Sequence, residues 1–419
     1  MKWFKKDFPL FANNPDIIYL DSAASIQKPK SVIDAMSHYL SHDYSNIHRW
    51  LYDLAMRSED LFDESKKAYA RLINAHSSEI IYTYNASYAF NMLAQVLVRS
   101  GELQAGDTVL VAIHEHHANI VPWQILQDYW VHLEFVGLTE NFELDMQDFT
   151  KKYTDTVKVV SLNHISNSTW TIQNLDRVRS LLRNDTLFVV DWSQSVQHIA
   201  VDVAQIWCDV FVATWHKLLA ATWLWMLWAK KELLEKWTPA WWAWDTIKDV
   251  TEDGFTFASS PTKYEPWTPH VLWAVSLLAA CRYIEDIGGL ATIESYENHL
   301  MMYTLSKFQK IQKQYGDEFM LVWKQDASMR IWIFSFVIHG LGPKTVWEYF
   351  AREHICIRSW WHCTHPLMHK VWLEHGTCRM SLYIYNTTQD IDEFFRVFKK
   401  ILRLARTWEY KDHPDDMCV

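Results

Sequence analysis

Short apolar segments that end in a polar or charged residue recur along this chain of 419 residues. One of them covers residues 209–213 and is followed directly by Thr-Trp-His-Lys, which ends at Lys217. Another apolar segment follows at residues 222–227. Because such runs are typical of buried strands, Lys217 is expected to lie between two strands. A lysine held there is able to form a Schiff base with a carbonyl compound. The alternative is a solvated lysine on the rim of the sheet, as most lysines are solvated.

A carboxylate ends the apolar segment that comes before these two. Residues 187–190 are apolar and lead into Asp191. An Asp at the end of one strand and a Lys at the end of the next fit a site for pyridoxal phosphate, in which the lysine holds the aldehyde and the Asp pairs with the pyridinium nitrogen. On these residues the chain resembles the class V aminotransferase family and, within it, the SUF-type (group II) cysteine desulfurases. The resemblance extends from about Tyr19 to about Leu402.

The order of the segments indicates the fold class. Strand-like and helix-like segments alternate, which implies parallel βαβ units, and the catalytic groups of such sheets lie at the carboxyl ends of the strands. We therefore expect an α/β protein with the pyridoxal-phosphate-dependent aminotransferase fold type I, in which a mostly parallel central sheet is joined to a smaller C-terminal α+β domain. The expected parts are an N-terminal arm (1–19), a large cofactor-binding domain (20–285), a small domain with the catalytic Cys loop (286–408) and a tail (409–419).

Charge and cysteine content exclude several classes of protein. Charged residues make up 21% of the chain and the formal net charge is −10, which argues against nucleic acid or an anionic membrane as the main partner. The six cysteines are scattered and form no CxxC pair, so a reduced cytoplasmic setting is expected rather than a disulfide framework. The sequence contains no apolar run of about 18 residues, so no membrane-spanning helix is expected.

Two segments of the expected large domain carry candidate cofactor ligands. Residues 84–91 open a predicted helix, and the free N–H groups at a helix start suit a phosphate. Ala86 and Ser87 are the candidates there, although most of the hydroxyl residues usual in the family are absent, and a helix N-cap is the alternative for Ser87. Further on, His116 lies in a His-Glu-His-His sequence. The resemblance implies that its imidazole stacks on the cofactor ring. A metal site is the alternative, but the spacing matches no standard zinc motif, so no metal is expected.

The resemblance implies further cofactor contacts on the loops that follow later strands. Asn167 and Gln194 correspond to residues near the pyridoxal 3′-oxygen, and Thr214 and His216 lie directly before the lysine. Asn167 is also expected to contact the substrate.

The resemblance also implies contributions across a dimer interface. His48 and Arg49 belong to a loop that lies over the active site of the dimer in this family, and we expect both to bind substrate; a plain surface loop is the alternative. Thr268 resembles the threonine that reaches the phosphate of the other subunit. A homodimer is therefore expected.

The expected small domain carries the candidate nucleophile. From Arg358 onward the sequence reads Arg-Ser-Trp-Trp-His-Cys-Thr-His-Pro. With Trp360 read as Gly, it resembles the desulfurase loop, in which Cys363 accepts the sulfur. His362, His365 and Arg358 are expected to lower the pKa of the thiol and so favour the reactive thiolate; an inert buried cysteine is the alternative. Because short loops stay close to the rigid domain, a persulfide on Cys363 is expected to need an acceptor protein that reaches in.

A second segment of this domain, residues 377–381, resembles the family's Arg-Ala-Ser motif. Its Arg379 is expected to bind the substrate carboxylate through two parallel hydrogen bonds. A structural salt bridge is the alternative.

Tryptophan and glycine occur in unusual numbers. The chain has 24 Trp and 10 Gly, whereas Gly normally runs near 7%, or roughly 29 residues for this length. Trp stands where the family has Gly at Trp50, Trp170, Trp192, Trp215, Trp223, Trp225, Trp267, Trp332 and Trp360. Gly supplies a positive φ and close backbone approach, and the largest side chain would overpack such turns. We therefore hypothesise that one codon is read as Gly in the source organism and as Trp in this translation. Trp3 and Trp123 are expected to be genuine, and a real enrichment in Trp is the alternative.

These residues together predict a pyridoxal-phosphate-dependent cysteine desulfurase, which converts L-cysteine into L-alanine and an enzyme-bound persulfide for iron–sulfur cluster assembly. Lys217, Cys363 and His116 are the expected catalytic residues. The expected partners are L-cysteine, a second copy of the chain and a SUF-type sulfur acceptor. Selenocysteine lyase activity uses the same chemistry. Two alternatives remain open: another class V aminotransferase or epimerase in which Cys363 is incidental, and an inactive assembly scaffold.

Overall fold

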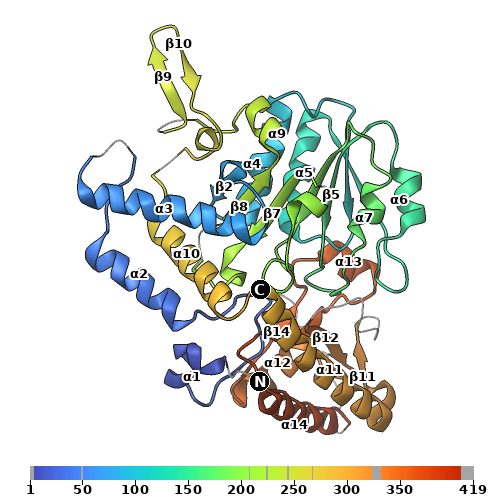
Figure 1. Ribbon diagram of the computed structural model, residues 1–419. Coiled ribbons are helices and arrows are strands. Elements are labelled where there is room, and N and C mark those ends of the chain that lie inside the picture. The colour runs from blue at the N-terminus through green and yellow to red at the C-terminus, as the bar shows by residue number, and fades with distance from the viewer. Residues whose placement is uncertain are drawn as a thin grey trace.

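The computed structural model describes residues 4–48, 51–206, 208–222, 225–242, 245–266, 268–322 and 332–406 (Figure 1). A seven-stranded sheet with the order β2-β8-β7-β6-β5-β3-β4 forms the centre of the large domain. Its strands are β2 (Ile80–Thr83), β3 (Thr108–Ala112), β4 (His132–Val136), β5 (Val157–Asn163), β6 (Leu187–Asp191), β7 (Val210–Thr214) and β8 (Trp225–Ala229). The pairs among β3 to β7 are parallel, and β8 runs antiparallel to both β7 and β2. The expected α/β fold with a mostly parallel sheet is confirmed, with one strand reversed.

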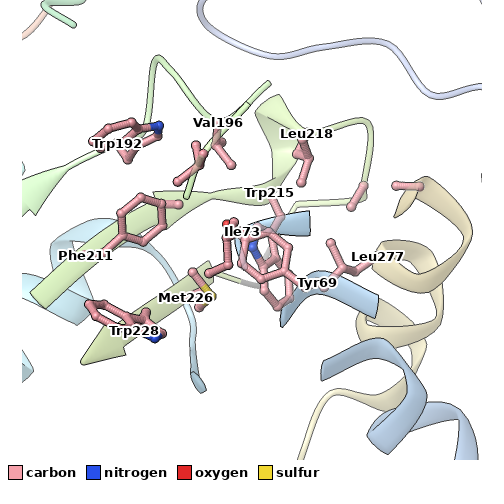
Figure 2. Close-up of a cluster of buried hydrophobic side chains, with 14 of the residues drawn as sticks. Tyr69, Ile73, Trp192, Val196, Phe211, Trp215, Leu218, Met226, Trp228 and Leu277 are labelled. Carbon is pink, nitrogen blue, oxygen red and sulfur yellow. The ribbon is translucent and has the colours of Figure 1, made fainter. Parts of the chain in front are cut away.

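The central strands of this sheet are buried on both faces, and for that reason they read as continuous apolar runs in the sequence. In β7, Val210 and Val212 join the apolar cluster that contains α4 (Ala86–Arg99). Phe211 and Ala213 point to the opposite face and join the cluster that contains α3 (Asp53–Leu72) and α10 (Val271–Asp286). Figure 2 shows part of this second cluster, in which Trp192, Phe211 and Trp215 lie above Met226 and Trp228, and Tyr69 and Leu277 approach from the helices.

Further helices cover the two faces of the sheet (Figure 1). They are α2 (Lys30–His42), which packs with α3 on α10, and the shorter α5 (Val121–Ile125), α6 (Met146–Lys152), α7 (Leu175–Arg179), α8 (Val203–Ile206) and α9 (Lys231–Lys236). This two-sided covering leaves the carboxyl ends of the parallel strands as the edge at which polar side chains can gather.

The small domain is an antiparallel sheet covered by helices. Its strands have the order β11-β12-β15-β14 and are β11 (Phe319–Leu321), β12 (Ile333–Ile338), β14 (Arg358–Trp360) and β15 (Thr377–Ser381). The helices are α11 (Leu290–Tyr315), α12 (Pro343–Arg352), α13 (His365–Lys370) and α14 (Thr388–Ala405). A separate apolar cluster, rich in Phe side chains from β12 and α14, forms its core.

The N-terminal segment joins the two domains. It contains α1 (Pro9–Asn13) and β1 (Ile18–Tyr19), and β1 pairs in parallel with β13 (Ile355–Cys356) of the small domain. The main-chain N–H of Ser381 donates to the carbonyl of Leu20 at 2.7 Å. The ring of Phe8 packs against Tyr283 of the large domain and Tyr385 of the small domain, so this segment is tied to both.

A two-stranded hairpin, β9 (Ile247–Thr251) and β10 (Gly254–Phe257), projects away from the body of the protein (Figure 1). Most of its residues are exposed. Among the helices of the described ranges, none combines the length and the apolar character that crossing a bilayer requires.

Candidate active site

A cavity lies where the carboxyl ends of β5, β6 and β7 meet the small domain. The strand ends contribute Asn163, Asp191 and Thr214 to its lining. The small domain contributes Cys363 and Arg379 to the same lining. Residues that are far apart along the chain therefore meet at one cavity, as the rule for the carboxyl ends of parallel strands predicts.

Lys217 lies at the end of the short helical turn η5 (Trp215–Lys217), directly after β7, and lines the cavity. Burial, followed by the nearby Arg379, lowers its pKa to about 7, and the carboxylate of Asp191 opposes this shift. A lysine with such a pKa is largely uncharged just above neutral pH, and an uncharged amine is the form that attacks a carbonyl carbon.

The turn that carries Lys217 is held by the segment after β1. The carbonyl of His216 accepts hydrogen bonds from Lys28 Nζ at 2.9 Å and from the main-chain N–H of Ile26 at 3.1 Å. The ring Nε2 of His216 lies 3.1 Å from the carbonyl of Ala24. His216 therefore anchors the turn, and its ring also packs against Trp225 at the cavity wall.

Asp191 ends β6, and its side chain is almost completely buried. Its Oδ1 accepts the main-chain N–H of Ser193 at 2.9 Å. Burial raises the pKa of this carboxyl group, against the effect of the Ser193 hydrogen bonds and Lys217. A desolvated carboxylate of this kind is stabilised by a cation placed against it, and a protonated pyridine nitrogen is such a cation.

His116 lies after β3 at the start of η3 (His117–Asn119) and lines the cavity. Burial, with Lys217 as the next cause, lowers its pKa to about 3, so the ring is neutral. Its Nδ1 accepts the main-chain N–H of Ala118 at 3.1 Å. This contact fixes the orientation of the ring, as a stacking role requires.

The start of α4 borders the same cavity through Ala86 and Ser87. The side chain of Asn85 caps the helix by accepting the main-chain N–H of Tyr88 at 2.7 Å. Asn85, rather than Ser87, is therefore the N-cap, and the Ser87 hydroxyl belongs to the first turn, where a phosphate is favoured.

The remaining cofactor candidates from the large domain also line the cavity. Gln194 donates from Nε2 to the carbonyl of Ala23 at 3.2 Å, and Thr214 donates from Oγ1 to the carbonyl of Ser193 at 3.3 Å. Asn167 donates from Nδ2 to the carbonyl of His362, so it touches the loop of Cys363 as well as the cavity.

Arg379, on β15, is buried at the cavity. Its Nη1 donates to the carbonyl of Asn167 at 3.2 Å, and its Nη2 lies 3.4 Å from Oδ1 of Asp21. Burial lowers its pKa to about 10, and Asp21 opposes that shift, so the guanidinium stays charged at neutral pH. The structural ion pair considered as the alternative exists, but it leaves the group at the cavity wall, where a carboxylate ligand can reach it.

Cys363 lies in the four-residue connection between β14 and α13, is half-buried and lines the cavity. The cations expected around it are only partly present. His362 is buried, its Nε2 lies 2.8 Å from Oγ1 of Thr377, and burial places its pKa well below the usual value. The expectation that His362 supplies positive charge to the thiol is therefore wrong, and Arg358 is the cavity-lining cation that remains of the three.

His48 and Thr268, which are expected to act across a dimer interface, do not line the cavity of their own chain. His48 contacts Glu59 at 3.2 Å and Asp245 at 3.4 Å. Thr268 is exposed. Arg49 lies outside the described residues, as do Trp50, Trp223 and Trp267.

Several residues at the cavity were not singled out from the sequence. Asn163 follows the same strand-end rule as Asp191 and could have been found by it. Ser193 directly follows the Asp191 segment. Asp21 holds Arg379 from more than 350 positions away, and no local sequence signal marks such a contact. No group of three or more His, Cys, Asp or Glu in the described ranges is arranged to hold a metal ion.

A family model described as "Aminotransferase class-V" matches residues 18–394. The chain belongs to the class V aminotransferase family. A probable cysteine desulfurase of Synechocystis is 34% identical over 407 residues, which is 95% of each chain. A probable cysteine desulfurase of Vibrio cholerae is 33% identical over 395 residues, 94% of this chain and 95% of that one.

Solved structures of the same family have the same fold. An apo cysteine desulfurase from Thermococcus onnurineus has a TM-score of 0.89 at 29% identity, covering 96% of this chain and 99% of that one. A cysteine desulfurase from Escherichia coli, in an S-sulfonic acid form, has a TM-score of 0.85 at 28% identity, covering 96% and 98%.

Membership of this family implies pyridoxal 5′-phosphate as the cofactor, and the cavity fits that group. Two buried polar atoms of cavity-lining residues have no hydrogen-bond partner among the described residues: Oδ1 of Asn163 and Oε1 of Gln194. Such atoms are costly unless a ligand or water pairs with them. Lys217 would hold the aldehyde of this cofactor, Asp191 its ring nitrogen and the start of α4 its phosphate.

Proposed function

We propose that the protein is a pyridoxal-phosphate-dependent cysteine desulfurase. One observation carries the proposal: Cys363 of the small domain lines the same cavity as Lys217 and Arg379. A buried, inert cysteine or an incidental one would not be expected to share the cavity with a lysine of lowered pKa. The cysteine desulfurases among the relatives support the same reaction.

In the proposed reaction, each of the cavity residues has a separate role. The bound cofactor withdraws electrons from the α-carbon of the substrate. Arg379 binds the carboxylate of L-cysteine, and the Lys217 amine takes and returns a proton. The thiolate of Cys363 attacks the substrate sulfur, so that an S–S bond forms as the C–S bond breaks. The C–S electrons stay with the substrate carbon, which gains a proton and leaves as alanine, while Cys363 keeps the sulfur as a persulfide.

The function is tested by measuring the products that the purified holoenzyme forms from L-cysteine. A desulfurase gives alanine and a persulfide in equal amounts. An aminotransferase gives a keto acid and retains the C–S bond, and an inactive scaffold gives neither product. L-selenocysteine as a parallel substrate tests the lyase activity, which uses the same residues.

The short connection that carries Cys363 supports a SUF-type enzyme. Only four residues separate β14 from α13, so the persulfide has little freedom to leave the cavity. A small acceptor protein with its own thiol would have to reach in, as part of iron–sulfur cluster assembly.

The five cysteines among the described residues are free, which supports a reducing, cytoplasmic setting.

Exposed apolar side chains support a homodimer. Leu40, Tyr44, Leu51, Leu54 and Met56 are exposed on α2, α3 and their connection, and Leu51 is 93% exposed. Exposed apolar patches mark interaction surfaces, and these side chains lie close together along the chain. In the proposed dimer, His48, Arg49 and Thr268 would act at the partner's cavity, as the resemblance implies.

Sedimentation of the holoenzyme across a dilution series is expected to show a dimer at all concentrations that support turnover. Changing Leu51 and Leu54 to Asp together is expected to give monomers and to lower activity. Met302→Asp, at an exposed apolar site on α11 in the small domain, is the matched control. A fully active monomer would contradict the dimer.

We also propose that Trp192, Trp215, Trp332 and Trp360 are glycines in the protein that the source organism makes. Trp360 has a φ of 108°, which lies outside the small left-handed region open to other residues. The indole N–H groups of Trp192 and Trp332 are buried without a partner in the described ranges, and each costs about 1–3 kcal/mol. Trp215 is included because it stands where the family has Gly. The indole of Trp123, expected to be genuine, donates to Asn119 Oδ1 at 3.0 Å.

Peptide mass spectra of protein isolated from the source organism are expected to show Gly at positions 192, 215, 332 and 360 and Trp at 123. In recombinant protein, Trp360→Gly is expected to raise the melting temperature, because glycine adopts a φ of 108° without strain. Trp123→Gly is expected to lower it, because it opens a cavity in the core. Trp found at position 215 in the native protein would contradict the proposal that these positions are glycines.

A further inference from the structure

The loop that carries Cys363 has a strained backbone. His362 has a φ of 50° and Cys363 a φ of 60°, so two consecutive residues other than glycine adopt the left-handed region. Each such residue costs roughly 1–2 kcal/mol relative to a right-handed conformation. The conformation that directs the thiol into the cavity therefore persists only because neighbouring groups hold it.

Two contacts from the large domain hold the carbonyl groups of these two residues. Asn167, after β5, donates to the carbonyl of His362. The main-chain N–H of His117, after β3, donates to the carbonyl of Cys363 at 3.0 Å. Both contacts cross from the large domain to the small domain, so they fix the loop relative to the cofactor-binding residues.

The ring of His117 makes a second contact with the loop. Its Nε2 lies 3.3 Å from the main-chain N of His365 and 2.8 Å from His365 Nδ1. A main-chain N–H can only donate, so Nε2 of His117 is the acceptor and carries no proton. The proton of the second contact then belongs to Nδ1 of His365. His117 thus holds the loop on both sides of Thr364.

These contacts from His117 to the Cys363 loop are called the clamp below. The segment that carries His117 is itself held by hydrogen bonds. Within η3, His117 directly follows His116, whose ring is oriented by Ala118. Asn119 of the same turn donates to Glu115 at 2.8 Å and accepts the indole N–H of Trp123 at 3.0 Å. The groups that would contact the cofactor and the groups that hold Cys363 are therefore adjacent on one fixed segment.

We propose that His117 is a positioning residue for Cys363, which holds the thiol in the cavity through its main-chain N–H and its unprotonated ring. The proposal rests on the proposed desulfurase function. A pH dependence follows from it, because a proton on Nε2 of His117 removes the acceptor for both His365 contacts and releases the loop.

The direction of that dependence follows from the surroundings of the ring. Burial, and then the neighbouring His365, lower the pKa of His117, so the clamp is intact at neutral pH. Because the pKa in the folded protein is below its unfolded value, the clamp is lost as the pH falls toward the lowered value. His116 on the same turn is neutral, and burial and then His369 lower the pKa of His365. Arg358 and Arg379 are positively charged groups that line the cavity. None of these groups stabilises a positive charge on His117.

The test measures how fast iodoacetamide alkylates Cys363 in the holoenzyme without substrate, relative to Cys356 in the same sample. His117→Ala is expected to raise this rate several-fold and to lower the persulfide formed from L-cysteine, while the absorbance of the bound cofactor stays unchanged. His117→Gln keeps an acceptor near the position of Nε2 and is expected to restore the slow rate. His132→Ala is the matched control, because His132 is exposed on β4 and does not line the cavity.

The pH profile separates positioning from a general structural role. Between about pH 5 and 8, where histidines titrate, the ratio of the wild-type rate to the His117→Gln rate is expected to rise as the pH falls. A ratio that stays constant would overturn the pH dependence, and equal rates for wild type and His117→Ala at neutral pH would overturn the clamp. Alkylation needs no turnover, so an enzyme that forms no alanine but shows this pattern would contradict the proposed function and leave the clamp standing.

Discussion

Replacing Lys217 with alanine is expected to abolish both the turnover of L-cysteine and the covalent attachment of the cofactor. No other lysine of the described ranges lines the cavity, so none can form the bond to the aldehyde or move the proton. Loss of a positioned acid–base group alone slows a reaction by about 10²–10⁴-fold, and loss of the attachment adds to this. The measurements are alanine release and the visible absorbance of the cofactor.

Lys230→Ala is the matched control for this variant. Lys230 directly follows β8, is part of an ion pair with Asp209 and lies away from the cavity, so activity and absorbance are expected to stay unchanged. If Lys217→Ala retained turnover together with a normal cofactor spectrum, the lysine would not be the attachment point.

The strand-end groups were predictable from the sequence because their signal is local. Each strand of a parallel sheet is an apolar run that a short stretch of sequence reveals, and the residue after it lies at a known edge. Lys217 and Asp191 were found in this way, and the structure places both at one cavity. The reversed direction of β8 was not predictable, since a buried strand reads alike in either direction.

The electrostatics of the cavity were less predictable, because they depend on burial and on contacts between distant segments. From the sequence, His362 is a potential cation beside Cys363. In the structure it is neutral, because burial, and then the nearby Arg379, lower its pKa well below the usual value. The same limit applies to Arg379, whose position depends on Asp21, and to His117, whose contact with His365 spans 248 positions.

Replacing Cys363 with alanine is expected to stop persulfide formation while leaving cofactor binding intact. Cys363 belongs to the small domain, whereas Lys217 and Asp191 belong to the large domain, so its removal leaves the groups expected to hold the cofactor in place. L-cysteine should still change the cofactor absorbance, because Arg379 and Lys217 remain. Alanine release should fall by at least about 10²-fold, since no thiolate is left to take the sulfur. The persulfide is measured by alkylation and mass spectrometry of the Cys363 peptide.

Two further measurements make this result specific. Cys356→Ala is the control, because Cys356 is half-buried in β13 and does not line the cavity; it is expected to retain full activity. In the wild type, a SUF-type acceptor is expected to raise the rate several-fold, because under the proposed SUF-type assignment the release of a shielded persulfide would limit turnover. Sulfur transfer by Cys363→Ala would show that another group accepts the sulfur. An acceptor without effect would show that the short loop does not shield the persulfide, and would contradict the assignment to the SUF type.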